Sequence, residues 1–536
     1  PRVRPRLAPG MPRPVRRRGG EGAGALTGGP HGDVLGERAR LTPEKTALVW
    51  DPTGERISYG ELDRRAAAAA GAIRGELGLA KGDRYAVLSG NCVEFIELFF
   101  AAGKSGAVFV PLSTRLTPHE LSTIAGDCAP SALFYGPEQR ETVDALRSKA
   151  PIPTFVALGE KASPRDLSWS DLSVRQSPPR TPVERCAGED PFCLLYTSGT
   201  TGRPKGAIVP HRMIAWNAIN TALSWQLRED DVAPVYTPLY HAGGLTVFIT
   251  PMAAIGGACV LMPGFDPAAV WQAIERHGCT VVLGVPTIFR MLREAPGFES
   301  ADLTRVRWMI SGGAPLPVFL IEEYRRRGVV LKQGFGMTEV GVNCFAMTSE
   351  EALGKAGSVG KPLLWTEARI AGEEGRELPP GEVGELWLRG PHVCSGYWND
   401  PEETRQAFTA DGWFRTGDLA RRDADGFYFI AGRRKEIFIS GGVNVSPLEV
   451  EAELLQHPQV ADAAVVGIPD PHWGEVGAAF VVPRGGASLS SDELAKFLGE
   501  RLARLKIPKR FELLSELPRT PYGKVVKAEL KRRIVP

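Results

Sequence analysis

The amino-acid sequence predicts an α/β protein with a large N-terminal domain of parallel-rich sheets flanked by helices and a small α+β C-terminal domain. Short apolar runs of strand length alternate with helix patterns through most of the chain, which is typical of parallel sheets covered on both faces. After about residue 360 the strands become shorter and Gly-Pro turns more frequent. The chain has 536 residues, of which 43% are hydrophobic and 24% charged, so it is long enough for several domains and has a globular composition.

The first strand–helix units are expected in the first quarter of the chain. YAVLS (85–89) and GAVFVPL (106–112) are continuous apolar runs, as in buried parallel strands. Between them, Asn91 is expected to cap a helix that has Glu94 at its N3 position. A second helix leads to the strand ALFY at 132–135.

The same alternation recurs in the middle of the chain. GACVLM (257–262), TVVLGV (280–285) and VRWMIS (306–311) are apolar strands, and helices are expected to begin after Asp266 and at Pro286. The recurrence predicts two similar βα halves.

A charged break at residues 432–435 is the expected domain boundary. It divides the chain into an N-terminal domain of residues 31–432 and a C-terminal domain of residues 433–536. The C-terminal domain is expected to contain helices at 448–456 and 491–502 and strands at 460–467 and 477–483.

Residues 1–30 are expected to form a disordered basic tail, because the segment is rich in Pro, Gly and Arg and has no apolar period. Seven arginines and no acidic residue fall within the first twenty residues. The chain carries 64 basic and 62 acidic residues, so without these seven arginines its net charge is about −5. A nucleic-acid-binding protein would spread positive charge over its fold, and that function is therefore disfavoured.

Eight cysteines without a CxxC pair, and eight histidines without a metal-ligand spacing, indicate neither a disulfide framework nor a zinc site. This pattern favours a reduced, cytoplasmic protein. Residues 232–265 contain no Asp, Glu, Lys or Arg, but four prolines interrupt the run, so no transmembrane segment is expected. We expect this stretch to line a buried pocket instead.

The segment YTSGTTGRPKG (196–206) has the composition of a phosphate cradle. Four hydroxyl residues and two glycines precede Lys205. Glycines let backbone N–H groups approach a phosphate, hydroxyls donate hydrogen bonds, and a lysine neutralises charge. Lysine is scarce, sixteen against forty-eight arginines, so the lysines at 205, 435 and 524, all in Gly-flanked loops, suggest positions where a compact charge is needed.

This segment resembles the phosphate-loop signature of the ANL superfamily of adenylate-forming enzymes, which includes acyl- and aryl-CoA synthetases, amino-acid adenylation domains and firefly luciferase. The resemblance extends from about residue 33 to 534. Phe335 stands where the family usually has tyrosine, so the hydrogen bond of the phenol is lost. Further segments resemble the family's motifs in the same order: SGGAP (311–315), GFGMTE (334–339), WFRTGD (413–418), GRRKE (432–436) and PRTPYGK (518–524).

The resemblance implies a role for each motif. Lys524 would be the catalytic lysine, Lys435 the hinge, and Glu339 the Mg²⁺ ligand, while Asp418 and Arg433 would bind the ribose. The remaining residues are implied to lie beside the acyl carboxylate (His241, counted as catalytic), to bind the nucleotide (Thr197, Ser198, Gly199, Thr200, Thr201, Gly202, Lys205, Gly312, Gly313, Ala314, Pro315, Gly334, Phe335, Gly336, Met337 and Thr338), to line a CoA tunnel (Ser440, Gly441 and Gly442) or to wall the acyl pocket (Tyr240, Ala242, Gly243 and Gly244).

These implications describe an ATP-dependent acyl-CoA synthetase. The acid would attack the α-phosphate of ATP to give acyl-AMP and pyrophosphate, and CoA would then take the acyl group and release AMP. Lys524 would stabilise the first transition state by placing a cation between two anions. The C-terminal domain would be a mobile lid, because one cleft serves both half-reactions. ATP and CoA are the expected co-substrates and Mg²⁺ the cofactor; a homodimer is left open.

The acid is expected to be an apolar monocarboxylate, a medium- or long-chain fatty acid first and a small aromatic acid second. Residues 232–265 offer no charge to pair a second carboxylate or an ammonium, and burying such a group unpaired costs several kcal/mol. Arg290, expected to face outward, is the nearby cation that could admit a dicarboxylate such as malonate. Small residues leave room for a long chain: Ala242, Gly243, Gly244, Gly313 and Gly334.

An amino-acid adenylation enzyme is the close rival. No acidic residue near 240–244 could pair an α-ammonium, and twelve residues after Lys524 leave no room for a carrier domain. A luciferase-type oxygenase has the same motifs and would be revealed by light emission with luciferyl-adenylate. A non-catalytic nucleotide-binding protein is disfavoured because Lys524, Glu339 and Asp418 occur together, and pyrophosphate release would distinguish it.

Overall fold

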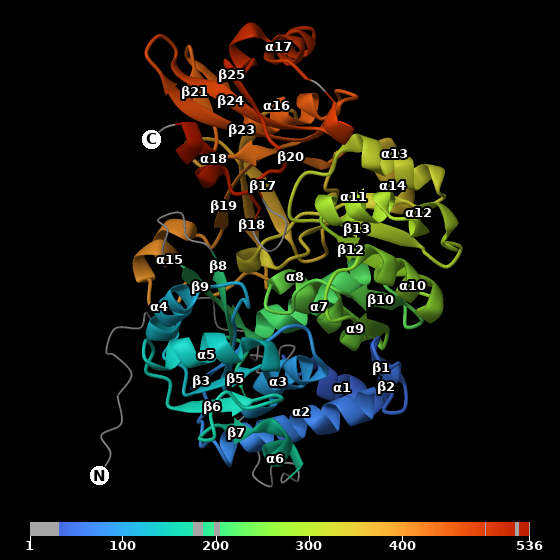
Figure 1. Cartoon of the computed structure of the whole chain (residues 1–536), viewed down its shortest axis with the longest axis vertical. Coiled ribbons are helices and arrows are strands. Elements are labelled where there is room, and N and C mark those ends of the chain that lie inside the picture. Colours follow the sequence, from blue (N-terminus) through green and yellow to red (C-terminus); the bar gives the residue numbers. More distant parts are fainter. Residues whose placement is uncertain (1–31, 175–185, 198–203, 488, 520–524, 535–536) are drawn as a thin grey trace, which may run out of the picture.

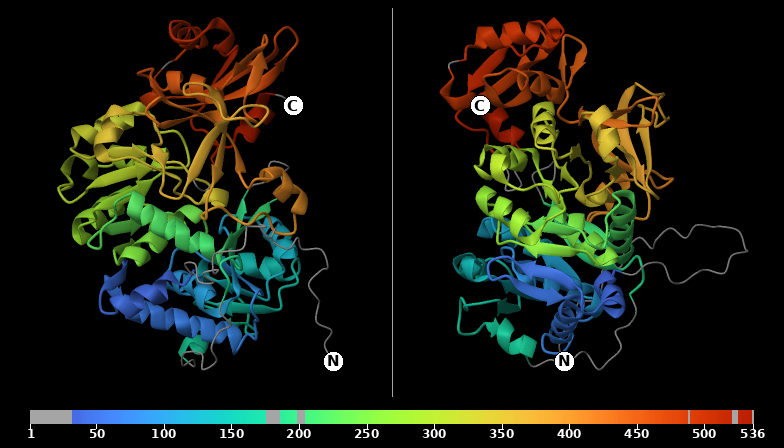
Figure 2. Two further views of the ribbon diagram at one scale, coloured as in Figure 1. Left: turned by 180° about the vertical axis from the view of Figure 1, so that it is seen from behind. Right: turned by 90° about the vertical axis from the view of Figure 1, so that its right-hand side faces the viewer.

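The computed structural model describes residues 32–174, 186–197, 204–487, 489–519 and 525–534. Figure 1 shows a large body of sheets and helices and, at its upper end, a smaller domain formed by the last hundred residues. In the right-hand view of Figure 2, the antiparallel sheet that precedes this small domain stands as an orange layer on one side of the molecule. The elements confirm the predicted α/β class.

The first βα half is built on a seven-stranded sheet with the order β7-β6-β5-β3-β4-β8-β9. Its neighbours are parallel except for the antiparallel pair β8–β9. The strands are β3 (Arg84–Leu88), β4 (Val108–Pro111), β5 (Ala132–Tyr135), β6 (Thr154–Ala157), β7 (Leu167–Ser168), β8 (Pro191–Thr197) and β9 (Lys205–Pro210). Its helices include α2 (Tyr59–Arg74), α3 (Val93–Ser105), α4 (Pro118–Cys128), α5 (Arg140–Arg147) and α6 (Trp169–Val174).

The predicted cap of α3 is wrong. The N-cap is Cys92, which makes no side-chain capping bond, and Glu94 follows one residue too early for the N3 position. Asn91 instead accepts a hydrogen bond from the backbone of Leu239 and donates to Thr237 and Met262. A tertiary contact has taken the side chain that local capping would have used.

The second βα half contains a four-stranded sheet, β10-β11-β1-β2, and a three-stranded parallel sheet, β12-β13-β14. The predicted cap of α10 is confirmed, since Asp266 accepts from the backbone of Ala269. The strands are β1 (Thr46–Trp50), β2 (Glu55–Ser58), β10 (Val232–Val235), β11 (Ala258–Leu261), β12 (Val281–Gly284), β13 (Trp308–Ser311) and β14 (Leu331–Gln333). The helices include α1 (Val34–Leu41), α7 (His211–Ser224), α10 (Pro267–His277), α11 (Pro286–Glu294), α12 (Gly297–Ser300) and α13 (Val318–Arg326).

The three-stranded sheet separates two cores. One face packs Met309 and Leu331 against α10–α13, whereas the other packs Trp308 and Ile310 in the main core of the large domain. This alternation follows from the two-residue period of a strand.

The charge-free stretch 232–265 does not form one long helix. It contains β10, the short α8 (Ala242–Gly244), the π-helix η2 (Leu245–Ile249), α9 (Thr250–Ile255) and β11. None of the helices in the described part of the chain is long and apolar enough to cross a membrane. All eight cysteines are free thiols.

The change of pattern after residue 360 corresponds to an antiparallel sheet with the order β17-β18-β19-β20. Its strands are β17 (Glu367–Ala371), β18 (Val383–Arg389), β19 (Phe414–Arg422) and β20 (Tyr428–Arg433), and α15 (Pro401–Ala407) lies before β19. Short elements precede it: β15 (Phe345–Ala346), α14 (Ser349–Gly354) and β16 (Lys361–Pro362).

The small domain has a five-stranded sheet of its own, formed by β21 (Phe438–Ser440), β22 (Val443–Val445), β23 (Val460–Asp470), β24 (Gly474–Pro483) and β25 (Arg510–Leu513). Its helices are α16 (Pro447–Leu454), α17 (Ser491–Gly499) and α18 (Lys527–Ile534). The two predicted helices and two predicted strands are all present, with somewhat different ends.

Arg290 joins the small domain to the large one. Its guanidinium donates to the carbonyl oxygen of Ala461 at 3.1 Å and lies 3.5 Å from the carboxylate of Asp462. The side chain is therefore engaged between the two domains.

Candidate active site

The predicted phosphate loop begins and ends on a β-hairpin. Thr197, the last residue of β8, pairs with Lys205, the first residue of β9. Ser198, Gly199, Thr200, Thr201 and Gly202 lie outside the described residues. The pairing of the two strands nevertheless places Thr197 and Lys205 side by side at the end of the hairpin from which the loop departs.

Lys205 is held by a carboxylate that the sequence interpretation missed. Its ammonium lies 2.6 Å from Oε1 of Glu403 on α15 and 5.8 Å from the ring centre of Tyr397, and only 11% of its side chain is exposed. Tyr397 in turn donates its hydroxyl to Oε1 of Glu339 at 3.1 Å. The predicted phosphate-binding cation and the predicted metal ligand thus share one neighbouring side chain.

Main-chain hydrogen bonds fix this arrangement. The segment 395–398 runs antiparallel to β9: Ser395 donates to Ile208, Ile208 donates to Gly396, and Trp398 donates to Gly206. Tyr397 pairs with Ala207 between them. Residues 395–398, nearly two hundred residues further along the chain, therefore place Tyr397 beside the hairpin of β8 and β9, which we call the phosphate hairpin.

The predicted adenine-binding segments follow the carboxyl ends of β13 and β14. Gly334 donates to the carbonyl of Ser311 at 2.7 Å, and Gly312 donates to that of Gly284 at 3.1 Å, so the two segments lie side by side. Gly313, Ala314 and Pro315 form the turn after β13, and Gly313 has a φ of 77°. Ligand sites of parallel sheets commonly lie at this edge.

The segment 334–339 is folded closely against the chain that follows it. A Cβ atom at Gly336 would lie 2.0 Å from the carbonyl oxygen of Val342, so only glycine fits. Met337 precedes the short 3₁₀ helix η3 (Thr338–Val340), which holds Glu339 at 5% exposure. The ring of Phe335 stands edge-on to Phe345, with 5.8 Å between ring centres.

The predicted ribose-binding residues face each other across two strands. Asp418 of β19 and Arg433 of β20 are register partners, and the guanidinium Nε lies 3.1 Å from the carboxylate Oδ1. Asp418 is 5% exposed, whereas the side chain of Arg433 is 47% exposed. The buried carboxylate of Asp418 thus lies beside the exposed guanidinium of Arg433, and such a carboxylate is suited to accept hydrogen bonds from hydroxyl groups.

The predicted acyl pocket wall begins at His241. Burial, and secondarily the nearby Arg115, lowers the pKa of His241 to about 4, so the imidazole is neutral at physiological pH. Tyr240 stacks against it with 4.8 Å between ring centres. A Cβ atom at Gly244 would lie 2.3 Å from the carbonyl oxygen of Pro238, which explains the glycine there. Ala242 and Gly243 complete the short helix α8.

Two asparagines hold the π-helix that continues this wall. Asn217 of α7 donates to the carbonyl of Thr246 at 2.8 Å, and Asn343 donates to that of Val247 at 3.4 Å. π-Helices in proteins are rare and frequently occur at functional sites. Here the widened turn follows α8, the short helix whose N-cap is His241.

Other predicted site residues are not brought to the strand ends. Ser440, Gly441 and Gly442 form the turn between β21 and β22, where Gly441 packs against Trp473. Figure 1 places β21 at the outer edge of the small domain, far from β13. Lys435 is exposed in the turn after β20. Lys524 lies outside the described residues, as does the basic segment 1–30.

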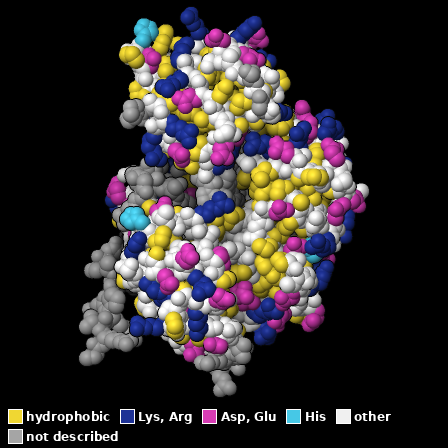
Figure 3. All heavy atoms as spheres, viewed as in Figure 1, with side chains coloured by type: hydrophobic (Ala, Val, Ile, Leu, Met, Phe, Trp, Pro, Cys, Tyr) yellow, Lys and Arg dark blue, Asp and Glu magenta, His cyan; other side chains and the backbone are white. Residues whose placement is uncertain are grey.

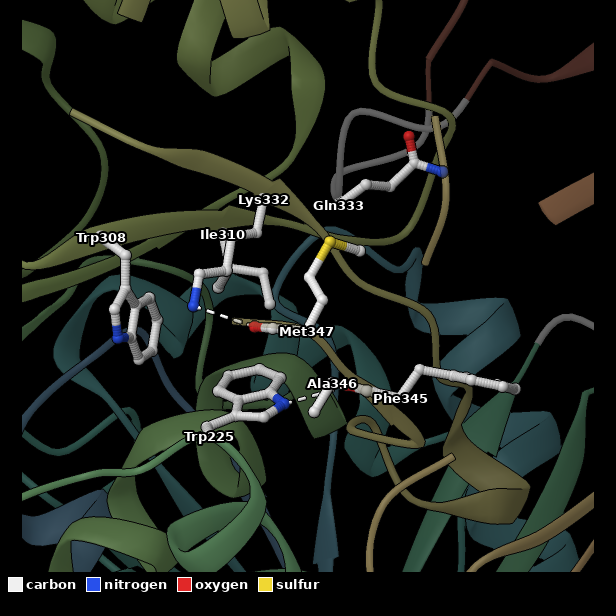
Figure 4. Close-up of a pocket in the computed structure, with 8 residues that line it drawn as sticks. All are labelled: Trp225, Trp308, Ile310, Lys332, Gln333, Phe345, Ala346 and Met347. Atoms are coloured by element: carbon white, nitrogen blue, oxygen red, sulfur yellow. Dashed lines mark hydrogen bonds between the residues drawn. The ribbon is translucent and has the colours of Figure 1, made fainter. Parts of the chain in front are cut away.

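A pocket below the strand ends contains a buried lysine that the sequence interpretation missed (Figure 4). Lys332 of β14 is 8% exposed and donates to the carbonyl of Met347 at 3.1 Å, with its ammonium 4.9 Å from the ring centre of Trp308. Burial, and secondarily Arg307, lowers its pKa to about 8. The lining residues are Trp225, Trp308, Ile310, Lys332, Gln333, Phe345, Ala346 and Met347.

The surface differs between the domains. Figure 3 shows hydrophobic side chains gathered on the large domain below the small one, whereas both signs of charge are interspersed over the small domain. Neither domain shows in this view the continuous basic face expected of a nucleic-acid-binding protein.

A phosphate hairpin, a paired carboxylate and arginine, and glycine-rich strand ends, combined with a large α/β body and a small α+β domain, define an adenylate-forming enzyme. The family model of the AMP-binding enzyme matches residues 35–398, and that of the AMP-binding enzyme C-terminal domain matches residues 449–524. The chain belongs to the AMP-binding enzyme family, that is, to the acyl-CoA synthetases of the ANL superfamily.

Relatives match over nearly the whole chain. A feruloyl-CoA synthase of Amycolatopsis sp is 42% identical over 497 residues, which cover 92% of this chain and 97% of that protein. The long-chain-fatty-acid–CoA ligase FadD13 of Mycobacterium tuberculosis is 36% identical over 94% of this chain and 98% of that protein. The crystal structure of ATP-bound MatB from Rhodopseudomonas palustris has a TM-score of 0.85 and 33% identity, covering 94% of this chain and 99% of that one.

Proposed function

We propose that this protein converts an aromatic carboxylic acid to its CoA thioester through an acyl-adenylate. The observation that carries the proposal is the cluster of aromatic side chains below β13 and β14, where the almost fully buried rings of Trp225, Trp308 and Phe345 line a small cavity. Aromatic rings pack favourably in stacked or edge-on arrangements against such side chains. The 42% identity to a feruloyl-CoA synthase supports the same substrate class.

In the first half-reaction, the residues of this chain bring two anions together. Thr197 and Lys205 bind phosphate oxygens, and Lys205 exchanges its contact with Glu403 for one with the nucleotide. Asp418 and Arg433 bind the ribose, and Phe335 stacks on the adenine. Lys524 stabilises the charge that develops as the carboxylate attacks the α-phosphate and pyrophosphate leaves.

His241 acts in its neutral form. Because its pKa is about 4, the imidazole does not protonate the attacking carboxylate. A charged imidazole at the same place would pair with the carboxylate and weaken the nucleophile.

The residues present fit a Mg²⁺ ion held together with ATP. Among the described residues, no group of three or more His, Cys, Asp or Glu side chains could hold a metal by itself. Mg²⁺ is usually bound by one or two carboxylates and the substrate phosphates, and Glu339 supplies one buried carboxylate near the phosphate hairpin. Bound there, the ion would neutralise charge on the phosphates.

We also propose that residues 433–536 form a mobile lid that turns about Lys435. The turn at Gly441 and Gly442 must approach the strand ends if it is to line the path of CoA. Lys435 lies exposed in a turn, and its N–H donates no hydrogen bond within the described part of the chain. Lys435→Pro should therefore keep adenylation and lose thioester formation, because proline restricts φ at the hinge. Equal loss of both half-reactions would contradict the hinge.

A fatty acid is the second candidate, supported by the 36% identity to FadD13 and by the small residues of the pocket wall. A pyrophosphate-release screen, with and without CoA, should compare cinnamic and benzoic acids with C4 to C16 fatty acids, malonate and amino acids. We expect the arylalkenoic acids to have the highest kcat/KM. A roughly fourfold rise per added CH₂ that overtakes them would favour the fatty acid instead.

A further inference from the structure

Lys332 projects from the face of the sheet that carries the predicted acyl and adenine contacts. It lies two residues before Gly334, the first residue after β14, so the two-residue period of the strand gives both positions the same face. Its register partner on β13 is Ile310, which is paired in turn with Leu283 of β12. All of the other side chains in this row are apolar, which makes an ammonium there unusual.

The ammonium has few partners for a buried charge. Its hydrogen bond goes to the Met347 carbonyl, and the ring of Trp308 lies below it. Lys332 makes no ion pair with any carboxylate in the described ranges. Glu351 is the acidic residue that raises the pKa of Lys332, but its side chain takes part in the capping box of α14 with Thr348 and lies 3.3 Å from the ammonium of Lys361. An ammonium has three donors, so two are available to a ligand.

This pocket adjoins the predicted acyl wall. A Cβ atom at Gly334 would lie 3.1 Å from Cδ1 of Ile310, and Phe345 touches Phe335 edge-on. On the other side, Trp308 lies 6.3 Å from Phe248 of the π-helix, measured between ring centres. The pocket is therefore enclosed by the strand ends and the wall that begins at His241.

Strand geometry gives the distance along the backbone between Lys332 and Gly334. Two residues of a strand span about 7 Å, which is the separation of Lys332 from Gly334 along β14. That span is comparable to a para-substituted phenyl ring. An aromatic acid whose carboxylate lies at Gly334 would direct its far end toward Lys332.

We propose that Lys332 is a specificity-determining residue of this enzyme, whose ammonium binds a phenolic oxygen at the far end of an aromatic acid while Trp225 and Trp308 contact the ring. This inference rests on the proposed function, since it assigns the substituent of the aromatic substrate. Burial lowers the pKa of Lys332 only to about 8, so at neutral pH the amine is still mostly protonated and can donate a hydrogen bond to such an oxygen. Arg307 lowers that pKa and Glu351 raises it.

The test compares 4-hydroxycinnamate with cinnamate, which differ by the distal hydroxyl. We expect the wild type to favour 4-hydroxycinnamate by about 10- to 100-fold in kcat/KM, the range of a hydrogen bond to a charged group. Lys332→Met should collapse this ratio. The matched control is Lys361→Met, which removes a lysine that also lies over an aromatic ring, 4.4 Å from the centre of Phe427, and should leave the ratio unchanged.

Each other outcome has a distinct meaning. A ratio that stays high in Lys332→Met would overturn the assignment, because a merely structural lysine affects both acids alike. Higher kcat/KM for 4-carboxycinnamate than for 4-hydroxycinnamate would overturn the phenolic oxygen in favour of a carboxylate. If the wild type turns over fatty acids but neither of the two cinnamates, the proposed function itself is refuted. If it turns over both cinnamates without preferring the hydroxylated one, only this inference is refuted. If Lys332→Met does not fold, Lys332→Gln retains a donor to Met347 and is measured instead.

Discussion

The cations that we assign to a nucleotide-facing region and to an acyl-facing region are held in opposite ways. Lys205 and Arg433 each have a carboxylate partner, Glu403 and Asp418, at 2.6 and 3.1 Å. Lys332 has a carbonyl and an indole ring. A cation that already contacts a carboxylate can exchange it for phosphate or ribose oxygens at small net cost, whereas a buried cation without one favours any substrate that supplies the missing oxygen.

The two regions also differ in how well their charges are paired before substrate binds. The nucleotide side is electrostatically satisfied and is suited to ligands that every catalytic cycle exchanges. On our proposal, the buried ammonium of Lys332 on the acyl side carries a desolvation cost that a matching acid reduces. Common chemistry and individual specificity are thus placed in regions of different electrostatic character.

The largest effect is expected from Lys524→Ala, which removes the predicted cation between the two reacting anions. Adenylation should slow by about 10²–10³, while thioester formation from supplied acyl-adenylate is retained. Pyrophosphate release and thioester formation are measured separately. Lys531→Ala, on the exposed side of α18, is the control. Normal pyrophosphate release by Lys524→Ala would remove the lysine from the nucleotide region altogether.

Asp418→Ala tests whether a carboxylate paired to arginine also serves a ligand. The KM for ATP should rise by about 10- to 100-fold, because hydrogen bonds to a charged group are lost. Asp425→Ala removes an acidic residue that pairs with Lys355 at 2.7 Å and should leave that KM unchanged. An unaltered KM in Asp418→Ala would mean that its ion pair with Arg433 is purely structural.

Lys332→Met should stabilise the fold at neutral pH. Folding lowers the pKa of Lys332 from 10.5 to about 8, so between these values the unfolded chain binds more protons and wild-type stability rises with pH. Below pH 8, burial of the protonated amine lowers the free energy of unfolding of the wild type by about 3 kcal/mol. Lys332→Met removes this cost but loses the hydrogen bond to Met347, which contributes about 1 kcal/mol.

Urea unfolding at several pH values measures this effect. Lys332→Met should exceed the wild type by about 2 kcal/mol at pH 7, with the difference shrinking as pH rises toward 10. Lys361→Met again provides the exposed control. A variant less stable than the wild type at pH 7 would show that Lys332 is better satisfied than its contacts indicate.

The smallest effect is expected from deleting residues 1–29. Steady-state kinetics should be unchanged, because the segment lacks the apolar residues needed to pack on a domain. Expression level and kcat/KM are the measurements. A fall in both would show that the segment is part of the folded enzyme.

The sequence allowed the fold class, the strand alternation and the position of most motifs to be predicted, because these depend on local pattern. The resemblance predicted that Asp418 and Arg433 bind the ribose; the structure brings the two side chains together, with 3.1 Å between Nε and Oδ1, and the ribose-binding role stays a prediction. The resemblance carried no information on Glu403 or Tyr397, whose positions depend on strand pairing across nearly two hundred residues.

Two further differences have the same physical origin. Asn91 has the composition of a cap, yet its side chain bonds to the backbone of Leu239, far along the chain. Lys332 stands in an apolar strand pattern, where a single lysine is normally read as an edge or surface residue. Its burial is decided by Trp225 and Met347, which come from other elements. The absence of charged residues from the segment 232–265 therefore did not predict that Lys332, from another element, lines the pocket.

The ladder between β9 and residues 395–398 has a consequence for engineering this protein. Hydrogen bonds at Gly206, Ile208 and Ser395 determine which side chains of that segment face the phosphate hairpin. One residue inserted between Ser395 and Trp398 would turn Tyr397 to the opposite side and separate it from Glu339. Chimaeras with related enzymes should therefore be joined at surface loops outside this ladder, with β9 and its antiparallel partner exchanged together as one cassette.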